Sequence, residues 1–412
     1  MKPLSLNDAQ ACVLQRAAPL GTKEMDLLQS LGRVLAQEVK SNRDHPPYDV
    51  SAMDGYAVRA GDLAAIPAQL KIVADIKAGE LPAITLKAGQ CARIMTGAKI
   101  PHGADTVLRV EDTEAVAPDI VQINVSVPVG RDIRRQGENL RSGAVTLEAG
   151  CEITPGVLGI LAMVKCARVQ VRRRPTVAIL SSGDELEGLH DAFDPDKVPD
   201  ANSYALMAQV QGLGIQPVLL GIANDDPVAL KNKLAQGLKY DVLLVSGGTS
   251  VGVHDFVRPT LEALGVAMHF WRVQMRPGHP AAFGTTDTGM VFCLPGNPVA
   301  SMVSFEQIVA PALRQMMGHG RLYRRTIQAR LTQALKHRPG NLEFVRVTLS
   351  RDAQGYLATP TGSQSSGVLL SMARADGLLV VPNESAGLAA GESATIQLLD
   401  GTAWQGENDI EG

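Results

Sequence analysis

The spacing of hydrophobic residues changes several times along the chain, and each change predicts a new structural unit. Residues 5–35 show the three-to-four-residue spacing of a helix, with Leu6, Ala9 and Val13 on one face behind a capping residue at Ser5. This amphipathic pattern is typical of packing rather than of chemistry. The chain is therefore expected to begin with helices that cover a larger body.

Short alternating segments follow between about residues 41 and 137, separated by Gly and Pro, and they predict a small β-rich domain. Residues 138–171 return to a mixed character. An apolar helix is expected from Pro155 to Val164, because Thr154 is a good cap and proline suits a first helical turn. If the N-terminal helices pair with this helix, the β-rich domain is an insertion.

Strand and helix alternate after the basic run of residues 172–174, which predicts a right-handed α/β domain with a parallel-rich sheet over residues 172–320. Asn202 and Asp226 are the expected caps of two helices, and a long apolar helix is expected to begin at Pro298. The expected strands cover residues 176–181, 216–222, 240–246, 266–271 and 290–294. From about residue 325 the period falls towards two again, so a small C-terminal β domain is expected. The fold class is thus multidomain, α/β plus β.

Length, charge and cysteine content narrow the possible functions. A chain of 412 residues exceeds one core, and 39 basic against 42 acidic side chains leave a net charge of −3. That balance does not favour nucleic-acid or membrane binding. The five cysteines show no C-x-x-C spacing, and the chain has neither an apolar signal region at its start nor a run long enough for a membrane span. We expect a soluble cytoplasmic protein with reduced thiols.

The most informative segment is a predicted buried strand that ends in a glycine-rich turn. Residues 240–246 are mostly apolar, and Ser246, Gly247 and Gly248 follow with Asp255 a few residues on. Glycines allow backbone N–H groups to approach a phosphate, and an acid nearby can hold a cation against it. A structural tight turn is the alternative reading, because one such turn alone is weak evidence.

Polar turns follow three further predicted strands, around Glu185, Asp225 and Asn297. Ligands of open parallel sheets bind outside the carboxyl ends of the strands, so these turns are expected to outline one cleft. Glu185, Asp225 and Asp255 would then lie close together and would need a divalent cation, for which their hard oxygen ligands favour Mg²⁺. The alternative is that these residues only cap helices or form turns.

The segment of residues 271–280 places Arg272, Arg276 and His279 on one turn-rich loop, a pattern that suits a tetrahedral oxyanion. Solvated surface arginines are the alternative. Residues 51–58, 93–98 and 132–138 are polar or basic turns of the β-rich domain, and composition does not decide whether they are plain turns or anion sites.

Taken together, these strings resemble the MoeA family of molybdopterin molybdenumtransferases, which includes the E domain of gephyrin and its plant counterpart. The resemblance covers nearly the whole chain, and such a set of ordered strings is highly specific. The strings that carry it are Ser51–Val58, Arg93–Ala98, Ile133–Glu138, Ser182–Leu186, Ser246–Gly252 and Leu294–Val299.

The resemblance implies a four-part subunit. An elongated helical part is expected from residues 1–40 and 138–171, an inserted β-rich domain from 41–137, a molybdopterin-binding α/β domain from 172–320, and a C-terminal β-barrel from 325–408. Related enzymes are elongated homodimers in which the α/β domain of one subunit and the inserted domain of the other share a cleft. A homodimer is therefore expected here.

The resemblance also implies a transferase of molybdenum cofactor biosynthesis, which inserts molybdenum from molybdate into adenylylated molybdopterin with Mg²⁺ and releases AMP. Asp225 and Asp255 would hold the magnesium ion. The implied catalytic residues are Asp54, Thr96, Arg134 and Glu185. The implied substrate-binding residues are Ser246, Gly247, Gly248, Ser250, Asn297, Arg272, Arg276, His279, Arg346 and Ser366. Molybdopterin adenylyltransferase and apo-molybdoenzymes are further expected partners. Neither a nucleic acid nor a membrane is expected as a partner.

Several positions depart from the family pattern. Arg272, Arg276 and His279 stand where relatives commonly carry lysine, and arginine offers a planar fork instead of a point charge. Asn341 replaces a frequent Arg, Asn139 a usual Asp, and Ala300 a frequent Ser. These changes bear on oxyanion affinity and on the choice between molybdate and tungstate, which the sequence does not decide.

Two other functions fit the same motifs. A related domain with the Ser-Gly-Gly turn transfers an adenylyl group to molybdopterin, although the additional inserted and barrel domains argue against that activity here. A scaffold that keeps the fold without catalysis is the non-enzymatic alternative. The presence of Asp54, Glu185, Asp225 and Asp255 favours the enzyme.

Overall fold

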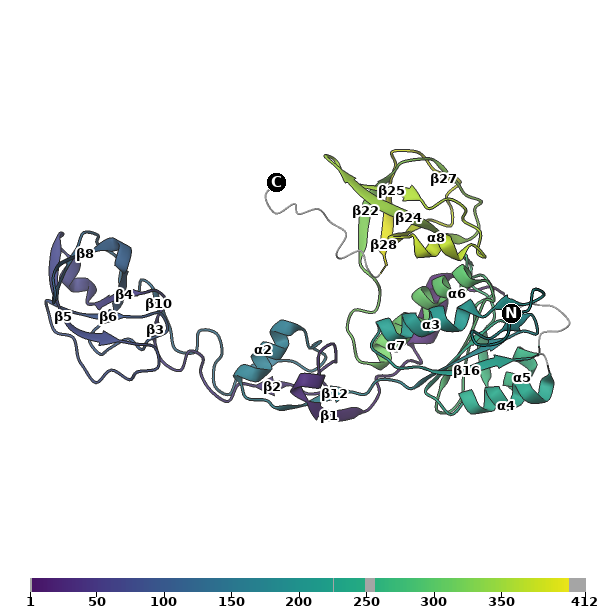
Figure 1. Ribbon diagram of the computed structural model, residues 1–412, viewed down its shortest axis with the longest axis horizontal. Helices are drawn as coiled ribbons and strands as arrows, with labels where there is room; N and C mark the ends of the chain where they lie inside the picture. Colours follow the sequence, from purple (N-terminus) through teal and green to yellow (C-terminus); the bar gives the residue numbers. More distant parts are fainter. Residues whose placement is uncertain (1, 225, 249–255, 400–412) are drawn as a thin grey trace.

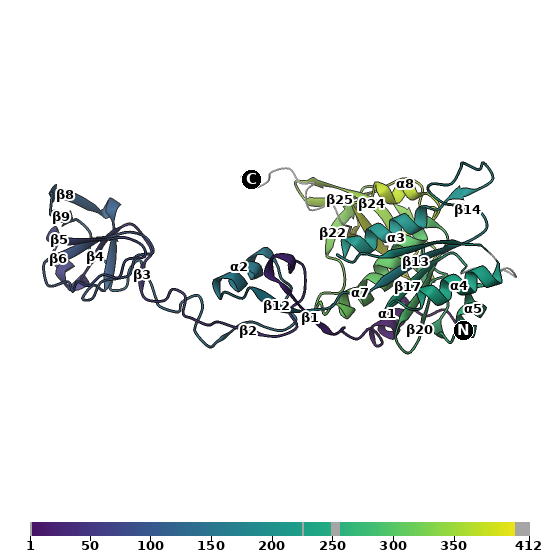
Figure 2. The same ribbon diagram turned by 60° about the horizontal axis from the view of Figure 1, so that its bottom comes forward.

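The computed structural model describes residues 2–224, 226–248 and 256–399. The molecule is elongated (Figures 1 and 2). A β-rich part lies at one end, a small central module follows, and an α/β domain with a β-barrel beside it forms the other end. Because the chain runs out to the far end and returns, the β-rich part is an insertion. No helix in the described ranges combines the length and the apolar character needed to cross a membrane.

The described residues of the insertion form a six-stranded sheet in the order β7-β4-β6-β5-β9-β8. The strands are β4 (Gly55–Val58), β5 (Ala68–Ile76), β6 (Gln90–Ile94), β7 (Thr106–Arg109), β8 (Thr113–Ala117) and β9 (Ile120–Ile123). A second short pair joins β3 (Val50–Ser51) to β10 (Ile133–Arg134). Apolar residues such as Ile94, Leu108 and Ile123 are buried. Strands therefore dominate the described residues of this region.

The central module contains more strand than the sequence suggested. Strand β1 (Thr22–Asp26) pairs with β12 (Arg168–Arg172), and β2 (Val39–Lys40) pairs with β11 (Val145–Leu147). Helix α2 (Pro155–Met163) starts after the Thr154 cap, as expected. The prediction of helix through residue 35 is wrong beyond α1 (Leu6–Leu14), because residues 22–26 find a partner strand far along the chain.

Helix α1 also does not pair with α2. It packs instead on α7 (Ala310–Met316) of the α/β domain, with Ala9 and Val13 fully buried. Pro311 of α7 has no N–H to bond the Gln307 carbonyl, and the helix widens there into the π-turn η4 (Phe305–Val309). Gln10 of α1 donates its Nε2 hydrogen bond to that carbonyl at 2.8 Å. The description of residues 1–40 as one elongated helical part is therefore corrected.

The α/β domain has a mixed sheet in the order β16-β13-β17-β21-β20-β18. Strands β13 (Val177–Ser182), β16 (Val218–Ala223), β17 (Val242–Ser246) and β21 (Met290–Leu294) are parallel. Strand β20 (Ala282–Thr285) is antiparallel to β21, and the edge strand β18 (Ala267–Phe270) is antiparallel to β20. Strand β20 was not predicted, because its short Ala-Phe-Gly-Thr segment shows no alternation. The expected parallel-rich sheet is present, with an antiparallel edge.

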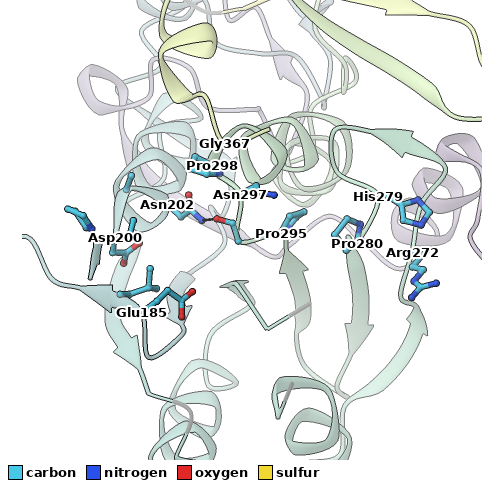
Figure 3. Close-up of a pocket in the computed structure, with 15 residues that line it drawn as sticks. Glu185, Asp200, Asn202, Arg272, His279, Pro280, Pro295, Asn297, Pro298 and Gly367 are labelled. Carbon is cyan, nitrogen blue, oxygen red and sulfur yellow. Dashed lines mark hydrogen bonds between the residues drawn. The ribbon is translucent and has the colours of Figure 1, made fainter. Parts of the chain in front are cut away.

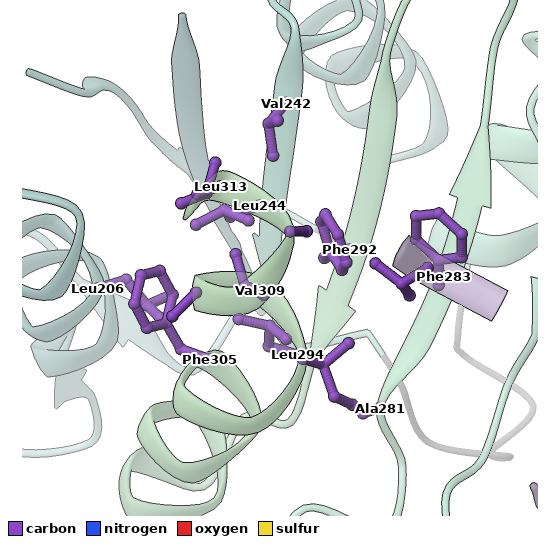
Figure 4. Packing of buried hydrophobic residues seen from close by; sticks show 14 of the residues in the cluster. Leu206, Val242, Leu244, Ala281, Phe283, Phe292, Leu294, Phe305, Val309 and Leu313 are labelled. Atoms are coloured by element: carbon purple, nitrogen blue, oxygen red, sulfur yellow. The ribbon is translucent and has the colours of Figure 1, made fainter. Parts of the chain in front are cut away.

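Alternate residues of the central strands supply two hydrophobic cores. Val242 and Leu244 face one layer, and Leu243 and Val245 face the other. The first layer contains α1, α3 (Ala201–Gly212), α6 (Pro298–Ser304), η4 and α7, and the second contains α4 (Pro227–Gly237) and α5 (Val257–Ala263). Figure 4 shows Leu206, Phe305 and Val309 packed against residues of β17 and β21. Burial on both faces explains the continuous apolar runs in the sequence.

The C-terminal strands close into a barrel, because β24 pairs with both β25 and β26. The barrel strands are β22 (Thr326–Leu331), β24 (Leu342–Asp352), β25 (Gly355–Pro360), β26 (Gly377–Val381) and β28 (Ser393–Leu398). Helix α8 (Leu369–Ala373) and the pair β23 (Leu335–Lys336) and β27 (Gly387–Leu388) complete it. Strand β19 (Met275–Arg276) leaves the α/β domain and pairs with β24, which holds the two domains together.

Candidate functional site

A hollow of about 890 Å³ opens at the carboxyl edge of the α/β sheet. The turns after β13 and β21, the start of α3 and the loop after β18 form its walls. Figure 3 shows Glu185, Asp200 and Asn202 on one side and Arg272 and His279 on the other. Strand β14 (Leu186–Glu187) and strand β15 (Val198–Pro199) border the acidic side. The expected gathering of polar strand-end turns at one edge is present for these residues.

The backbone conformation and close packing at this edge require glycine at residue 247. Gly247 has a φ of +91°, and a Cβ on it would lie 2.3 Å from the backbone carbonyl oxygen of Ser182. Its N–H donates to the carbonyl of Leu294 at 3.1 Å. The turn after β17 is therefore clamped between the two neighbouring strands, and no side chain fits at residue 247.

Glu185 lies close to the end of β13. Gly183 has a φ of +151°, and a Cβ there would stand 2.4 Å from a carboxylate oxygen of Glu185. The carboxylate thus folds back over the backbone of Gly183 while it lines the hollow. An acidic group at this edge can meet a cation or a hydroxyl of a ligand.

Asn202 joins two strand ends, a role that sequence reasoning missed. Its Nδ2 donates to Ser246 Oγ at 2.8 Å and to the Gly296 carbonyl at 2.7 Å. The prediction that Asn202 caps α3 is wrong, because Asp200 is the cap and accepts from Ser203 N at 3.0 Å. An acid three residues before Ser203 was the available signal for that cap.

Two buried polar groups lie at this position. Asn202 Oδ1 is buried and has no hydrogen-bond partner within the described residues. Buried acceptors are nearly always satisfied, so this oxygen fits contact with a ligand donor in the hollow it lines. Ser246 is 2% exposed and its hydroxyl already accepts from Asn202. Ser246 therefore supports the turn through this buried hydrogen bond.

A second hollow of about 670 Å³ adjoins the first and shares His279, Pro280, Pro295 and Asn297 with it. It lies between the α/β domain and the barrel. The barrel contributes Asn341 and the turn of residues 364–366, and the α/β domain contributes Arg276 and Ala300. Of the predicted substrate-binding residues, Arg276, His279, Asn297 and Ser366 meet here. Arg272 lines the first hollow instead.

Arg346 lies behind the second hollow rather than in its wall. It is 1% exposed and donates to the carbonyl of Ser365 at 3.3 Å and to Ser371 Oγ at 3.3 Å. Burial lowers the pKa of its guanidinium to about 10, partly opposed by the charge of Glu343. The structure therefore places Arg346 as a support of the turn that carries Ser366.

Three predicted site residues, Asp225, Ser250 and Asp255, lie outside the described residues. In the remaining chain no group of three or more His, Cys, Asp or Glu side chains gathers closely enough to hold a metal ion. The chemistry of the donors still suits Mg²⁺, because Glu185 brings carboxylate oxygens to the same sheet edge at which β16 and β17 end.

Asp54 and Thr96 form a hydrogen-bonded pair in the insertion. Asp54 Oδ1 accepts from Thr96 N at 2.7 Å and from Thr96 Oγ1 at 2.8 Å. These bonds lower the pKa of the exposed Asp54 carboxyl. Arg134 is exposed on β10 in the same domain. The three residues lie on or next to β4, β6 and β10, and Figure 1 shows these strands at the opposite end of the molecule from the α/β domain that carries the hollows. One chain therefore does not bring them to its own hollows.

The fold and the site define a class of multidomain protein in which an α/β domain carries its hollows at the carboxyl edge of the sheet. The family model described as a probable molybdopterin binding domain matches residues 178–315, and these residues form the α/β walls of both hollows. The MoeA N-terminal region, domains I and II, matches residues 4–164, and the MoeA C-terminal region, domain IV, matches residues 328–399. The chain belongs to the MoeA family.

Relatives and solved structures agree over nearly the full length. A molybdopterin molybdenumtransferase from Nostoc sp. is 36% identical over 385 residues, covering 91% of this chain and 88% of the relative. One from Bacillus subtilis is 31% identical over 418 residues, covering 98% and 96%. The crystal structure of a molybdopterin biosynthesis MoeA protein from Pyrococcus horikoshii has a TM-score of 0.78 at 29% identity, covering 97% of this chain and 100% of that one. The family is thus one of transferases in molybdenum cofactor biosynthesis.

Proposed function

We propose that the chain inserts molybdenum from molybdate into adenylylated molybdopterin, with Mg²⁺, and releases AMP. The observation that carries this proposal is the junction of two unlike hollows at the carboxyl edge of one sheet. The first hollow is lined by an acidic side chain, an amide side chain and a glycine-containing turn, and the second is lined by Arg276. A phosphorylated organic substrate and a small oxyanion need such a pair of sites side by side.

The first hollow suits the nucleotide-linked pterin. Gly296, in the turn after β21, lines this hollow without a side chain and leaves room for a phosphate, and the buried Asn202 Oδ1 offers an acceptor to a ring N–H. Glu185 repels phosphate unless a cation stands between them. We assign that cation as Mg²⁺ held by Asp225 and Asp255, where it would neutralise charge on the phosphoanhydride that breaks when AMP leaves.

The second hollow suits the oxyanion. Arg276, with a side chain 63% exposed, presents a planar guanidinium, and the residues 364–366 turn supplies hydroxyls on the facing wall. His279 and Asn297 lie on the wall common to both hollows, which is where molybdenum would have to pass to reach the pterin. Molybdate and tungstate have the same charge and shape, so we expect both to bind.

We further propose a homodimer with a shared cleft. Asp54, Thr96 and Arg134 belong to the insertion, which lies at the other end of the molecule from the α/β domain of the same chain, so they do not act at that chain's hollows. Helix α2 is built of apolar residues, glycine and proline, yet only Leu161 in it is buried. The helix contacts η1 (Leu27–Gln29), where Leu28 is 85% exposed, and Leu31 in the following turn is 55% exposed. Such an apolar face on the central module is available for a second copy.

The first experiment is AMP release from adenylylated molybdopterin, with and without Mg²⁺ and molybdate, followed by reconstitution of an apo-molybdoenzyme. Release that depends on both ions, together with reconstitution, supports the proposal. Formation of adenylylated molybdopterin from ATP instead would indicate the adenylyl transfer reaction. Tight substrate binding without turnover would indicate a scaffold. None of the five cysteines, all of which lie in the described ranges, forms a disulfide, which fits a reducing compartment, and we place the reaction in the cytoplasm.

The shared cleft has its own test. Asp54→Ala and Glu185→Gln subunits are each expected to form inactive homodimers, because each removes a group from every cleft. A mixed dimer keeps one intact cleft, so up to half of the activity per dimer is expected to return. No recovery in a purified heterodimer would contradict the shared cleft without affecting the proposed reaction.

A further inference from the structure

Three charged or polar side chains, each in contact with the next, support the wall of the second hollow. Arg276 Nε lies 3.5 Å from Glu343 Oε1, and His337 Nδ1 lies 2.6 Å from the other oxygen, Oε2. The three residues come from β19, from β24 and from the segment after β23. The exposed fraction of the side chain falls along this series, from 63% for Arg276 to 11% for Glu343 and 2% for His337.

Glu343 stands among cations. Arg276 and Glu343 are register partners in the parallel pair β19–β24, which sets them side by side. The buried Arg346 lies close enough that Arg276 lowers its pKa and Glu343 raises it, after the larger effect of burial. The two guanidinium groups repel one another, and both are attracted by the one carboxylate of Glu343.

His337 fixes the rotamer of this carboxylate. His337 Nδ1 and Glu343 Oε2 are 2.6 Å apart and share a hydrogen bond, and the His337 side chain is only 2% exposed. Its other ring nitrogen, Nε2, is buried without a hydrogen-bond partner in the described residues. Because the buried ring has little freedom to move, it fixes the position of Oε2, and Oε1 stays directed at Arg276.

We propose that His337 and Glu343 are positioning residues of the oxyanion hollow, which hold the guanidinium of Arg276 so that its Nη groups face the ligand. The ion pair engages the Nε side of Arg276, and its Nη groups have no hydrogen-bond partner among the described residues. A pre-oriented fork loses less side-chain entropy when it binds a tetrahedral anion. This inference rests on the proposed function, because the anion it serves is the molybdenum source.

The test is titration calorimetry of the full-length protein with tungstate and with molybdate. Arg276→Ala is expected to weaken binding by roughly ten-fold or more, the loss of one charge-assisted contact. His337→Ala is expected to weaken it about three- to ten-fold, because the fork is no longer held. His337→Asn retains a donor near the Nδ1 position and is expected to stay within about two-fold of the parent. The exposed neighbour Lys336→Ala is the matched control and should bind like the parent.

Two comparisons separate positioning from a general effect on the fold. In an Arg276→Ala background, His337→Ala should cause no further loss, since both changes remove the same interaction. Glu343→Gln should also weaken binding, although removal of a negative charge near an anion would by itself tighten it. Thermal unfolding of each variant reports the fold independently of the anion.

The outcomes are distinct. Loss with His337→Ala, rescue by His337→Asn and no added loss in the Arg276→Ala background support the proposal. Unchanged binding in His337→Ala, tighter binding in Glu343→Gln, or an additive loss in the double variant would each overturn it while leaving the proposed reaction intact. If the parent protein binds neither oxyanion, the oxyanion assignment of the proposed function fails together with this inference.

Discussion

Replacement of Gly247 by alanine tests the turn after β17, which lies against Gly296 in the wall of the first hollow. Two costs follow from its geometry. A residue with a Cβ at a φ of +91° is strained by about 1–2 kcal/mol. The new Cβ would also lie 2.3 Å from the Ser182 carbonyl oxygen, so two packed strand ends must separate, which costs about 1–3 kcal/mol more. We therefore expect the α/β domain to lose about 2–5 kcal/mol of its free energy of unfolding.

Gly265→Ala is the matched control in the same domain. Gly265 has a φ of +86°, but a Cβ at this residue would have no atom within 4 Å, so only the backbone strain applies. A loss of about 1–2 kcal/mol is expected for it. The difference between the two variants isolates the steric contact with Ser182.

The assay is urea unfolding followed by tryptophan fluorescence. The chain has two tryptophans, and Trp271 is 7% exposed within the second core layer of the α/β domain. A Trp404→Phe background leaves Trp271 as the reporter of that domain, which matters because a multidomain chain need not unfold in one step. If Gly247→Ala lowers the stability no more than Gly265→Ala does, the close approach of the turn to β13 does not constrain the site.

Three further predictions concern single side chains. Asn202→Ala removes two buried hydrogen bonds that tie strand ends together, and about 2–3 kcal/mol of unfolding free energy should be lost in the same fluorescence assay, with a rise in KM for the pterin substrate. Hydrogen bonds from Arg173 lower the pKa of Asp241 to about 2, so the stabilising contribution of its carboxylate is present above about pH 4 and disappears as the pH falls to about 2. Asp241→Asn should remove this contribution, which is on the order of 1 kcal/mol after allowance for solvent screening. The measurement is the free energy of unfolding of both proteins across that pH range. Asp54→Asn removes the charged acceptor of the two hydrogen bonds from Thr96, and AMP release should fall at least about ten-fold. The unfolding midpoint of the insertion should stay within experimental error, since the pair is exposed. Normal turnover would exclude a role for Asp54 in the cleft.

Local patterns in the sequence were sufficient for most of the α/β domain. Helix α4 begins after Asp226, as predicted, because an acidic cap followed by proline allows few alternatives. Strands β17 and β21 coincide with apolar runs, since both faces of a central strand are buried and most of its residues must therefore be apolar. The helix predicted up to residue 35 failed beyond Leu14, because the preference of residues 22–26 is weak locally and their pairing with β12 decides their conformation.

The candidate site shows the same division. The tight turn at Gly247 and the position of Glu185 after β13 could be recognised, because close backbone approach and charge demand particular residue types, whereas Asp225 and Asp255 lie outside the described residues. Asn202 and His337 could not, because each contacts a group outside its own local segment, and neither position carries a local signal for that contact. Arg346 was expected at a substrate, but burial behind the residues 364–366 turn gives it a supporting place.

The amino-acid sequence by itself determined the order of the structural units, the polar strand ends of the α/β sheet and membership of the MoeA family pattern, since these depend on residue type and on spacing along the chain. Only the tertiary structure decided which groups meet. The junction of the two hollows, the clamp at Asn202 and the series Arg276–Glu343–His337 arise from pairing between separate strands and domains. Such contacts are set by the packing of whole layers, because interior side chains must fill space together, and no local window contains that information.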